Sequence, residues 1–335
     1  MTSEISARAA SLPVSAEEFR AAEKTAALLG GSGRGVGYGK LIVLGEHSVV
    51  YGKPAIALPL PQMSMSVTAR PTTGESRIVA EFYTGPIDSA PRALTAPITA
   101  GRAVLDWLEC PDTQFEIAIT NTVPVGSGLG SSAASARAIV TAISQSLGVS
   151  LSERETYDLI QIAERVAHGN PSGLDAAVTG AQGPIRFVSG KYESFEFDEQ
   201  VWFVIADTGV HGRTSTAVGA VRQFVSDQPG AGGALITELG DLTEDAQRTA
   251  ELGAKMDRAQ QILTELGVSN AALDHLIAAA RTAGAAGAKL TGGGQGGSMV
   301  ALAHSARHAE ELASALWAAG AAGVWQQRSG PERNA

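Results

Sequence analysis

A glycine-rich stretch in the middle of the chain limits how the surrounding sequence can fold. The segment NTVPVGSGLGSSAASARAIVTAI, residues 121–143, follows the alternating pattern QFEIAIT and ends in a run of small and apolar residues. The alternation predicts a strand and the later run a helix, so the glycines lie in the connection. A helix N-terminus carries backbone N–H groups without intrahelical partners, and glycines let the backbone curve around an anion. The stretch predicts a phosphate-binding loop, and a flexible turn with Ser131 as helix cap is the alternative.

Composition and charge narrow the class of protein. The chain has 335 residues, a length typical of two domains, and 44% of them are hydrophobic, enough for a sizeable core. The net charge of −9 argues against binding a phosphate backbone, so no nucleic acid partner is expected. No apolar run reaches the roughly 18 residues of a membrane span, and the N-terminus lacks a secretory pattern. The single cysteine, Cys110, excludes an intrachain disulfide and fits a reducing, cytoplasmic location without a membrane partner.

Strand-like and helix-like segments follow one another irregularly along the chain. The pattern predicts an α+β class with mixed sheets, because it lacks the strict alternation of a doubly wound sheet. We place a domain boundary before the buried-strand run VWFVIADTG, which gives domains at 37–198 and 199–330. Residues 1–36 combine a helical pattern at 15–29 with the segment GGSGRGVGYG, and we expect an N-terminal extension there. Packing of this extension on the body is the alternative.

A second glycine cluster, KLTGGGQGG, spans residues 289–297 and is followed by a strand-like segment. A dinucleotide-binding motif would instead open a helix, so the match of this cluster to G-x-G-x-x-G is weak. Five glycines in six positions indicate that something approaches this backbone closely. A ligand phosphate and the first glycine loop are the two candidates.

A third motif, AERVAHGNPSGLDAAV, has the pattern of one helix ending and another beginning. Gly169 is placed for a left-handed C-cap, and Asn170 is predicted to cap a helix that starts at Pro171. Glu164 lies before this break and Asp175 lies after it. Carboxylates near a phosphate site suit Mg²⁺ binding and proton abstraction, and two ordinary surface acids are the alternative.

A fourth motif, GKLIVLGEHSVVYGKPA, begins at Gly39 and carries three charged or titratable candidates. Lys40 starts a predicted strand, and Glu46 and His47 lie at its far end. Such side chains are usually solvent-exposed residues at the edge of a strand. Three glycines nearby make this explanation weaker here.

The order of these motifs resembles the three-motif signature of the GHMP kinase superfamily. GKLIVLGEHSVVYGKPA, PVGSGLGSSAA and KLTGGGQGG stand in the superfamily order over about residues 37–325. The first of them, together with HGNPSGLD, is most similar to the mevalonate kinase branch. The resemblance implies the two-domain GHMP kinase fold. Its N-terminal, ATP-binding domain is related to domain 2 of ribosomal protein S5, and its C-terminal domain is ferredoxin-like.

The resemblance also implies an activity and its residues. The activity is ATP-dependent phosphorylation of (R)-mevalonate to 5-phosphomevalonate, with Mg²⁺ as cofactor and ATP and mevalonate as partners. Asp175 would take the proton from the attacking hydroxyl, Lys40 would lie beside it, and Ser132 and Glu164 would be metal ligands. The implied nucleotide-binding positions are Pro124, Gly126, Ser127, Gly128, Leu129, Gly130, Ser131 and Ser132. The implied substrate-binding positions are Glu46, His47, Arg186, Gly293 and Gly294.

Two alternatives stay open within the superfamily. A phosphomevalonate kinase binds a phosphorylated substrate, for which we would expect more basic residues than the segments around Glu46 and Asp175 contain. Loss of Lys40 or Asp175 would favour a non-catalytic ATP and metabolite sensor, and both residues are present. Because relatives are often dimers, the resemblance also suggests a homodimer.

Overall fold

The computed structural model describes residues 31–169, 171–212 and 214–331. The predicted helical pattern at 15–29 and Asn170 therefore lie outside the described residues. Contacts between Cα atoms group the chain into two compact units. Of the described residues, unit 1 holds 31–39 and those within the segments Pro61–Val123 and Ser131–Pro171. Unit 2 holds Lys40–Leu60, Pro124–Gly130 and the chain from Ser172 onward.

These units interleave along the sequence, whereas the sequence analysis divided the chain once, between residues 198 and 199. The segment 40–60 and the glycine loop 124–130 group with the C-terminal part of the chain. This grouping follows from contacts that are distant in sequence, which local patterns do not report.

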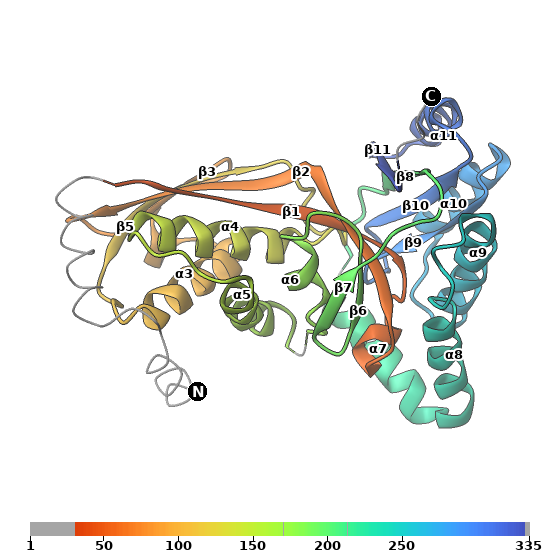
Figure 1. The fold of residues 1–335 in the computed structure, drawn as a ribbon, viewed down its shortest axis with the longest axis horizontal. Coiled ribbons are helices and arrows are strands. Elements are labelled where there is room, and N and C mark those ends of the chain that lie inside the picture. Colours follow the sequence, from red (N-terminus) through yellow and green to blue (C-terminus); the bar gives the residue numbers. More distant parts are fainter. Residues whose placement is uncertain (1–30, 170, 213, 332–335) are drawn as a thin grey trace. The chain divides into compact units, whose positions relative to one another are not determined.

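Unit 1 combines a sheet with three helices that pack on one another (Figure 1). Residues 65–72 of strand β2 pair antiparallel with β5, β5 pairs parallel with β3, and β3 pairs antiparallel with β4. The apolar residues Phe115 and Ile117 of β5 are buried, as the alternating pattern predicts. The strands are β3 (Arg77–Ala80), β4 (Tyr83–Pro86) and β5 (Gln114–Asn121), together with the part of β1 (Gly33–Leu44) up to Gly39 and the part of β2 (Ala55–Thr72) from Pro61; the rest of β1 and β2 belongs to unit 2. The helices are α3 (Thr95–Trp107), α4 (Ser131–Ser146) and α5 (Glu153–His168), with short 3-10 turns η2 (Ile87–Ser89) and η3 (Arg92–Leu94).

Strand β1 begins at Gly33, inside the segment that the sequence analysis assigned to the N-terminal extension. Its alternate glycines lie directly on helix α4. A Cβ added to Gly35 would lie 2.0 Å from the carbonyl oxygen of Ala138. Two strand residues advance by about 6.6 Å and four helix residues by about 6 Å, so the two repeats stay nearly in step. Gly33 approaches the carbonyl oxygen of Ala142 in the same way, and Gly37 approaches that of Ala134.

For residues 33–36, which the sequence analysis placed in the N-terminal extension, these contacts show the alternative, packing on the body. From Gly33 onward, the glycines are strand residues that let the backbone of β1 approach the backbone of α4. Since α4 starts at Ser131, directly after the glycine loop, this contact also positions the helix end that follows the loop.

Unit 2 is built on a four-stranded antiparallel sheet in the order β11-β8-β10-β9. Helices α9, α10 and α11 pack on this sheet (Figure 1). The sheet strands are β8 (Val201–Asp207), β9 (Gly287–Thr291), β10 (Ser298–Ala303) and β11 (Gly323–Ser329). The helices are α6 (Leu174–Val178), α7 (Thr214–Asp227), α8 (Pro229–Asp241), α9 (Thr249–Glu265), α10 (Ala271–Thr282) and α11 (Ala306–Ala318). Three further elements of unit 2 lie outside this four-stranded sheet: η1 (Ser48–Tyr51), β6 (Ile185–Val188) and β7 (Lys191–Ser194). Strand β6 pairs with residues 55–57 of β2.

The mixture of sheets and helices confirms the predicted α+β class. Within the part of the chain that the structure describes, every helix is too short or too polar to cross a membrane.

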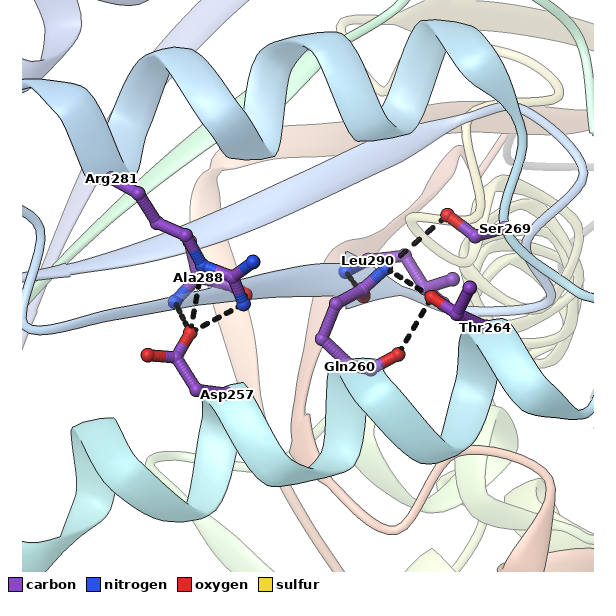
Figure 2. Close-up of polar contacts among 7 residues, drawn as sticks. All are labelled: Asp257, Gln260, Thr264, Ser269, Arg281, Ala288 and Leu290. Atoms are coloured by element: carbon purple, nitrogen blue, oxygen red, sulfur yellow. Dashed lines mark hydrogen bonds and ion pairs between the residues drawn. The ribbon is translucent and has the colours of Figure 1, made fainter.

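Strand β9 is an edge strand, and side chains of α9 complete its hydrogen bonds (Figure 2). The N–H of Ala288 donates to Asp257 Oδ1 at 3.0 Å, and the N–H of Leu290 donates to Gln260 Oε1 at 2.8 Å. Asp257 is itself held by Arg281, whose Nη2 donates to the same oxygen at 2.6 Å. An edge strand otherwise presents unpaired backbone groups, so these contacts fix β9 against α9.

Candidate active site

The predicted motifs that fall in unit 2 come together through the backbone of β1. The N–H of Lys40 donates to the carbonyl oxygen of Leu129 in the glycine loop at 2.9 Å. Two residues further on, the N–H of Ile42 donates to Thr291 Oγ1 at 3.1 Å, and that hydroxyl donates back to the carbonyl of Ile42. Strand β1 therefore links the first glycine loop to the second glycine cluster.

The first glycine loop has the backbone that its sequence predicts. Gly126, Gly128 and Gly130 have φ values of 74°, 78° and 79°, a region that favours glycine. The side chain of Ser127 is buried and donates to the carbonyl of Pro124 at 2.7 Å, while the Leu129 side chain is buried. These side chains hold the turn, so a bound anion would meet backbone N–H groups here.

The backbone of the second glycine cluster packs against the backbone of the first glycine loop. A Cβ on Gly292 would lie 2.7 Å from the carbonyl oxygen of Gly128, and one on Gly297 would lie 2.6 Å from that of Ser127. The sequence analysis gave a ligand phosphate and the first glycine loop as candidates for what approaches this backbone. The structure shows the first glycine loop there. The second glycine cluster is followed by strand β10 and not by a helix. This agrees with the weak match of the cluster to a dinucleotide-binding motif, which would open a helix.

The segment after β8 contacts the other side of the loop, and the sequence analysis did not include it. The His211 ring places Nδ1 2.9 Å from the carbonyl oxygen of Val125, and the Gly212 N–H donates to the carbonyl of Gly126 at 3.0 Å. A carbonyl oxygen only accepts, so the His211 proton lies on Nδ1. The segment VHG, residues 210–212, has no local sequence pattern that indicates this contact. Its position directly after a buried strand is the one sequence feature that points to it.

Lys40 and Asp175 lie side by side, as predicted. The distance between Lys40 Nζ and Asp175 Oδ1 is 3.5 Å, with 3% of the lysine side chain and 33% of the aspartate side chain exposed. The stem of Lys40 passes over Gly130, where a Cβ would lie 2.8 Å from Lys40 Cγ. The pair is therefore held against the end of the glycine loop, within unit 2.

The helix that carries Asp175 starts later than the sequence analysis predicted. Gly169 ends α5, but its φ of 78° and ψ of −76° differ from the predicted left-handed cap, and α6 begins at Leu174 rather than at Pro171. Gly173, with a φ of 94°, occupies the N-cap position. Two glycines near one break offer two possible helix starts, and the structure uses the second, which puts Asp175 in the first turn of α6.

Glu46 and His47 occupy a tight turn between β1 and η1, and both side chains are buried. His47 has a φ of 60°, which is uncommon for a residue with a Cβ and marks a strained position. Its Nε2 lies 2.9 Å from the carbonyl oxygen of Gly293, so Nε2 carries the proton. Burial lowers the pKa of His47 to about 4, which keeps the ring neutral near pH 7. Its Nδ1 is buried and has no hydrogen-bond partner among the described residues.

Glu46 forms a fully buried ion pair with Lys289, a residue to which the sequence analysis gave no role. Lys289 lies in β9 and also donates to the carbonyl of Leu290 at 2.7 Å. Burial raises the pKa of Glu46 and lowers that of Lys289, while the attraction between the two charges opposes both shifts. A lone lysine in the apolar segment AAGAKLT was the available signal, because a buried lysine needs a partner.

Of the other two predicted substrate contacts in the second cluster, Gly293 supplies the carbonyl that binds His47. Gly294 packs on the backbone of Val268, whose carbonyl oxygen would lie 2.2 Å from an added Cβ. Arg186 faces two acidic side chains instead, Glu193 at 3.7 Å and Glu244 at 3.6 Å. Its role as a substrate contact stays a prediction.

The two predicted metal ligands lie in unit 1, on the packed helices α4 and α5. Ser132 Oγ is buried and has no hydrogen-bond partner among the described residues, and Glu164 is buried on α5. Across the described ranges, the structure holds no group of three or more His, Cys, Asp or Glu that could bind a metal alone. One carboxylate and one hydroxyl fit Mg²⁺ in a kinase, because this ion usually takes its other ligands from phosphates and water.

Comparison with known proteins identifies the family of this chain. The family model "GHMP kinases N terminal domain" matches residues 98–183, and "GHMP kinases C terminal" matches residues 234–322. The chain belongs to the GHMP kinase family.

Among its relatives, the mevalonate kinase of Pyrococcus horikoshii is 35% identical over 307 residues, which cover 84% of this chain and 91% of that protein. The L. major mevalonate kinase, solved in complex with R-mevalonate, is 26% identical with a TM-score of 0.76, covering 90% of this chain and 96% of that one. A Streptococcus pneumoniae phosphomevalonate kinase has a TM-score of 0.73 at 19% identity, covering 88% and 99%, a likeness of fold alone.

Proposed function

We propose that this protein is a mevalonate kinase, which transfers the γ-phosphoryl group of ATP to the 5-hydroxyl of (R)-mevalonate. The observation that carries the proposal is the Lys40–Asp175 pair, held against the end of the glycine loop. The relatives described above, which bear the name mevalonate kinase, support this choice of substrate.

In this proposal Asp175 is the general base. An alcohol is a weak nucleophile until its proton is removed, and a carboxylate beside the hydroxyl can accept that proton. One third of the Asp175 side chain is exposed, so a substrate can reach it, while Lys40 is almost fully buried behind it. The Lys40 ammonium would stabilise the negative charge that develops on the attacking oxygen.

The glycine loop and the start of α4 would bind the phosphates of ATP. Backbone N–H groups at a loop and a helix N-terminus offer fixed donors and a favourable dipole to an anion. Mg²⁺, held by Ser132 and Glu164 together with ATP, would neutralise charge on the phosphate oxygens. Phosphoryl transfer depends mainly on such positioning and charge neutralisation.

Substrate recognition would involve the turn at Glu46 and His47. Because His47 is neutral and its proton lies on Nε2, its buried Nδ1 can accept a hydrogen bond from a substrate hydroxyl. The hydrogen bond from Nε2 to the carbonyl of Gly293 fixes the direction in which this acceptor points. Assembly as a homodimer also stays a prediction.

A side-by-side assay tests the substrate. ADP release is measured with mevalonate, phosphomevalonate, homoserine and galactose at equal concentrations. We expect strong turnover with mevalonate alone, because the motifs that surround Glu46 and Asp175 match that branch of the family. Preferred turnover of phosphomevalonate would replace the proposal with its alternative, and ATP binding without turnover of any substrate would indicate a sensor.

A second experiment tests the metal ligands. Ser132→Ala and Glu164→Gln are each expected to raise the Mg²⁺ concentration for half-maximal activity several-fold and to lower kcat, since each removes one oxygen ligand. Ser144→Ala, on the same helix α4, is the control: its hydroxyl donates within the helix to Thr141 and should leave the Mg²⁺ dependence unchanged. An unchanged Mg²⁺ dependence in both site variants would remove the two residues from the metal site.

A further inference from the structure

The segment 208–212, between β8 and α7, has no part in the mechanism just described, although it contacts both glycine-rich segments. The N–H and the hydroxyl of Thr208 donate to the carbonyl of Gly297 at 3.0 and 2.7 Å. The N–H of Gly297 donates in return to the carbonyl of Val210 at 2.7 Å, and the Thr208 hydroxyl accepts from the N–H of Val210 at 3.2 Å. These four hydrogen bonds fix the segment on the second glycine cluster.

From this fixed segment, two donors reach the first glycine loop. His211 Nδ1 donates to the carbonyl of Val125 at 2.9 Å, and the N–H of Gly212 donates to the carbonyl of Gly126 at 3.0 Å. The His211 ring also lies directly on the loop, because a Cβ added to Gly126 would lie 2.5 Å from Nδ1. Two consecutive peptide groups of the loop are therefore held by their carbonyl oxygens, one by a side chain and one by the main chain.

A held carbonyl also sets the direction of the N–H group in the same peptide. In a trans peptide, the C=O and N–H bonds lie in one plane and point in nearly opposite directions. The N–H groups of Gly126 and Ser127 therefore point away from the segment 208–212. Across the described residues, neither of these N–H groups donates to a protein acceptor. Successive free N–H groups of this kind can bind an anion.

The bond from His211 is the main constraint on the peptide that precedes Gly126. The Val125 side chain is 56% exposed, so little packing restrains this residue. Among the described residues, His211 supplies the one hydrogen bond to the Val125 carbonyl. Without this bond the peptide between Val125 and Gly126 could rotate, because glycine permits a wide range of backbone angles.

We propose that His211 is a positioning residue for nucleotide binding, which fixes the peptide between Val125 and Gly126 and so keeps the Gly126 N–H directed at the phosphates of ATP. This inference rests on the proposed function, since it assigns the glycine loop to ATP. His211 acts through the loop backbone and does not itself contact the nucleotide. The ring donates from Nδ1 both when it is neutral and when it is an imidazolium, so the role requires a donor at this position and not a positive charge.

The test compares His211→Ala with His211→Asn. Asparagine Nδ2 is as many bonds from Cα as histidine Nδ1, so asparagine can donate to the same carbonyl, whereas alanine cannot. Isothermal titration with the Mg²⁺ complex of ADP measures binding directly. His211→Ala is expected to raise the dissociation constant about threefold to tenfold, the range for loss of one hydrogen bond. His211→Asn should stay within about twofold of the wild type, because it restores the donor.

Steady-state kinetics with ATP give a second readout. In His211→Ala, the KM for ATP should rise by a factor similar to that of the dissociation constant, while kcat changes by less than about twofold, because the contact acts on binding. His275→Ala is the matched control. His275 is also exposed, and its Nε2 lies 3.1 Å from the carbonyl oxygen of Ala319 at the end of α11, so this variant loses the same kind of bond elsewhere in unit 2. Its affinity for ADP should equal that of the wild type.

Three results would overturn the inference: wild-type affinity in His211→Ala, an equal loss in His211→Asn, or an equal loss in His275→Ala. An equal loss in His211→Asn would assign the effect to the ring or its charge. The titration contains no acceptor substrate, so it tests His211 whichever acceptor the four-substrate assay identifies. Turnover of an acceptor other than mevalonate would overturn the proposed function alone.

Discussion

Replacing Asp175 by asparagine is expected to lower kcat by about 10²–10⁴-fold, the usual contribution of a positioned general base. Asparagine keeps the shape of the side chain but cannot accept the proton of the attacking hydroxyl. The glycine loop and the start of α4 remain intact, so the affinity for ATP should change little. The effect should appear in kcat more than in KM, because the base acts in the transition state.

Single-turnover phosphoryl transfer measures this step directly. Lys40→Met should also lower the rate, because the variant removes the ammonium that lies 3.5 Å from Asp175. If the two side chains act as one unit, the double variant will lose much less than the product of the two single losses. A near wild-type rate in Asp175→Asn would eliminate this residue as the base and leave it as an acid on the surface of α6.

Replacing Gly35 by alanine is expected to lower the free energy of unfolding by about 1–3 kcal/mol, the typical cost of overpacking. The new Cβ would lie 2.0 Å from the carbonyl oxygen of Ala138, which is far inside contact distance. A backbone carbonyl within a helix cannot rotate away, so β1 or α4 must move.

Urea unfolding followed by circular dichroism measures the change. Gly74→Ala is the control in the same unit, because an added Cβ there meets only Thr72 Oγ1, at an ordinary 3.6 Å. Its stability should stay within about 0.5 kcal/mol of the wild type, as is usual for surface changes. Equal stability of Gly35→Ala and Gly74→Ala would show that β1 does not need the close contact with α4.

Much of the site could be predicted because its signals are local. Glycines permit the positive φ values that the loop adopts, and the density of glycines in the second cluster indicated a close approach, for which the first glycine loop was one of two candidates. The pairing of Lys40 with Asp175 came from the resemblance to a family, since no local pattern joins residues that far apart in sequence.

Other features could not be predicted, because they depend on partners distant in sequence. A glycine run that links two segments has the same local pattern as one that packs on a helix. The two cases differ only in the alanines of α4, about a hundred residues away, and so the first residues of β1, 33–36, were assigned to the extension. Lys289 was missed for the same reason, since Glu46 lies 243 positions before it.

Main-chain groups supply several of the contacts that hold the glycine loop of unit 2. The carbonyls of Gly126 and Leu129 accept from the N–H groups of Gly212 and Lys40, and Gly292 touches the backbone of Gly128. Such a loop has little conformational freedom to lose when a nucleotide arrives, so less of the binding free energy is needed to order it. Apart from Ser127 and His211, whose side chains bind carbonyls of the loop, side chains around the loop can vary without altering its shape. A methyl group at Gly128 or Gly292 would deform the loop, so natural variation should be confined to side chains that face away from these contacts.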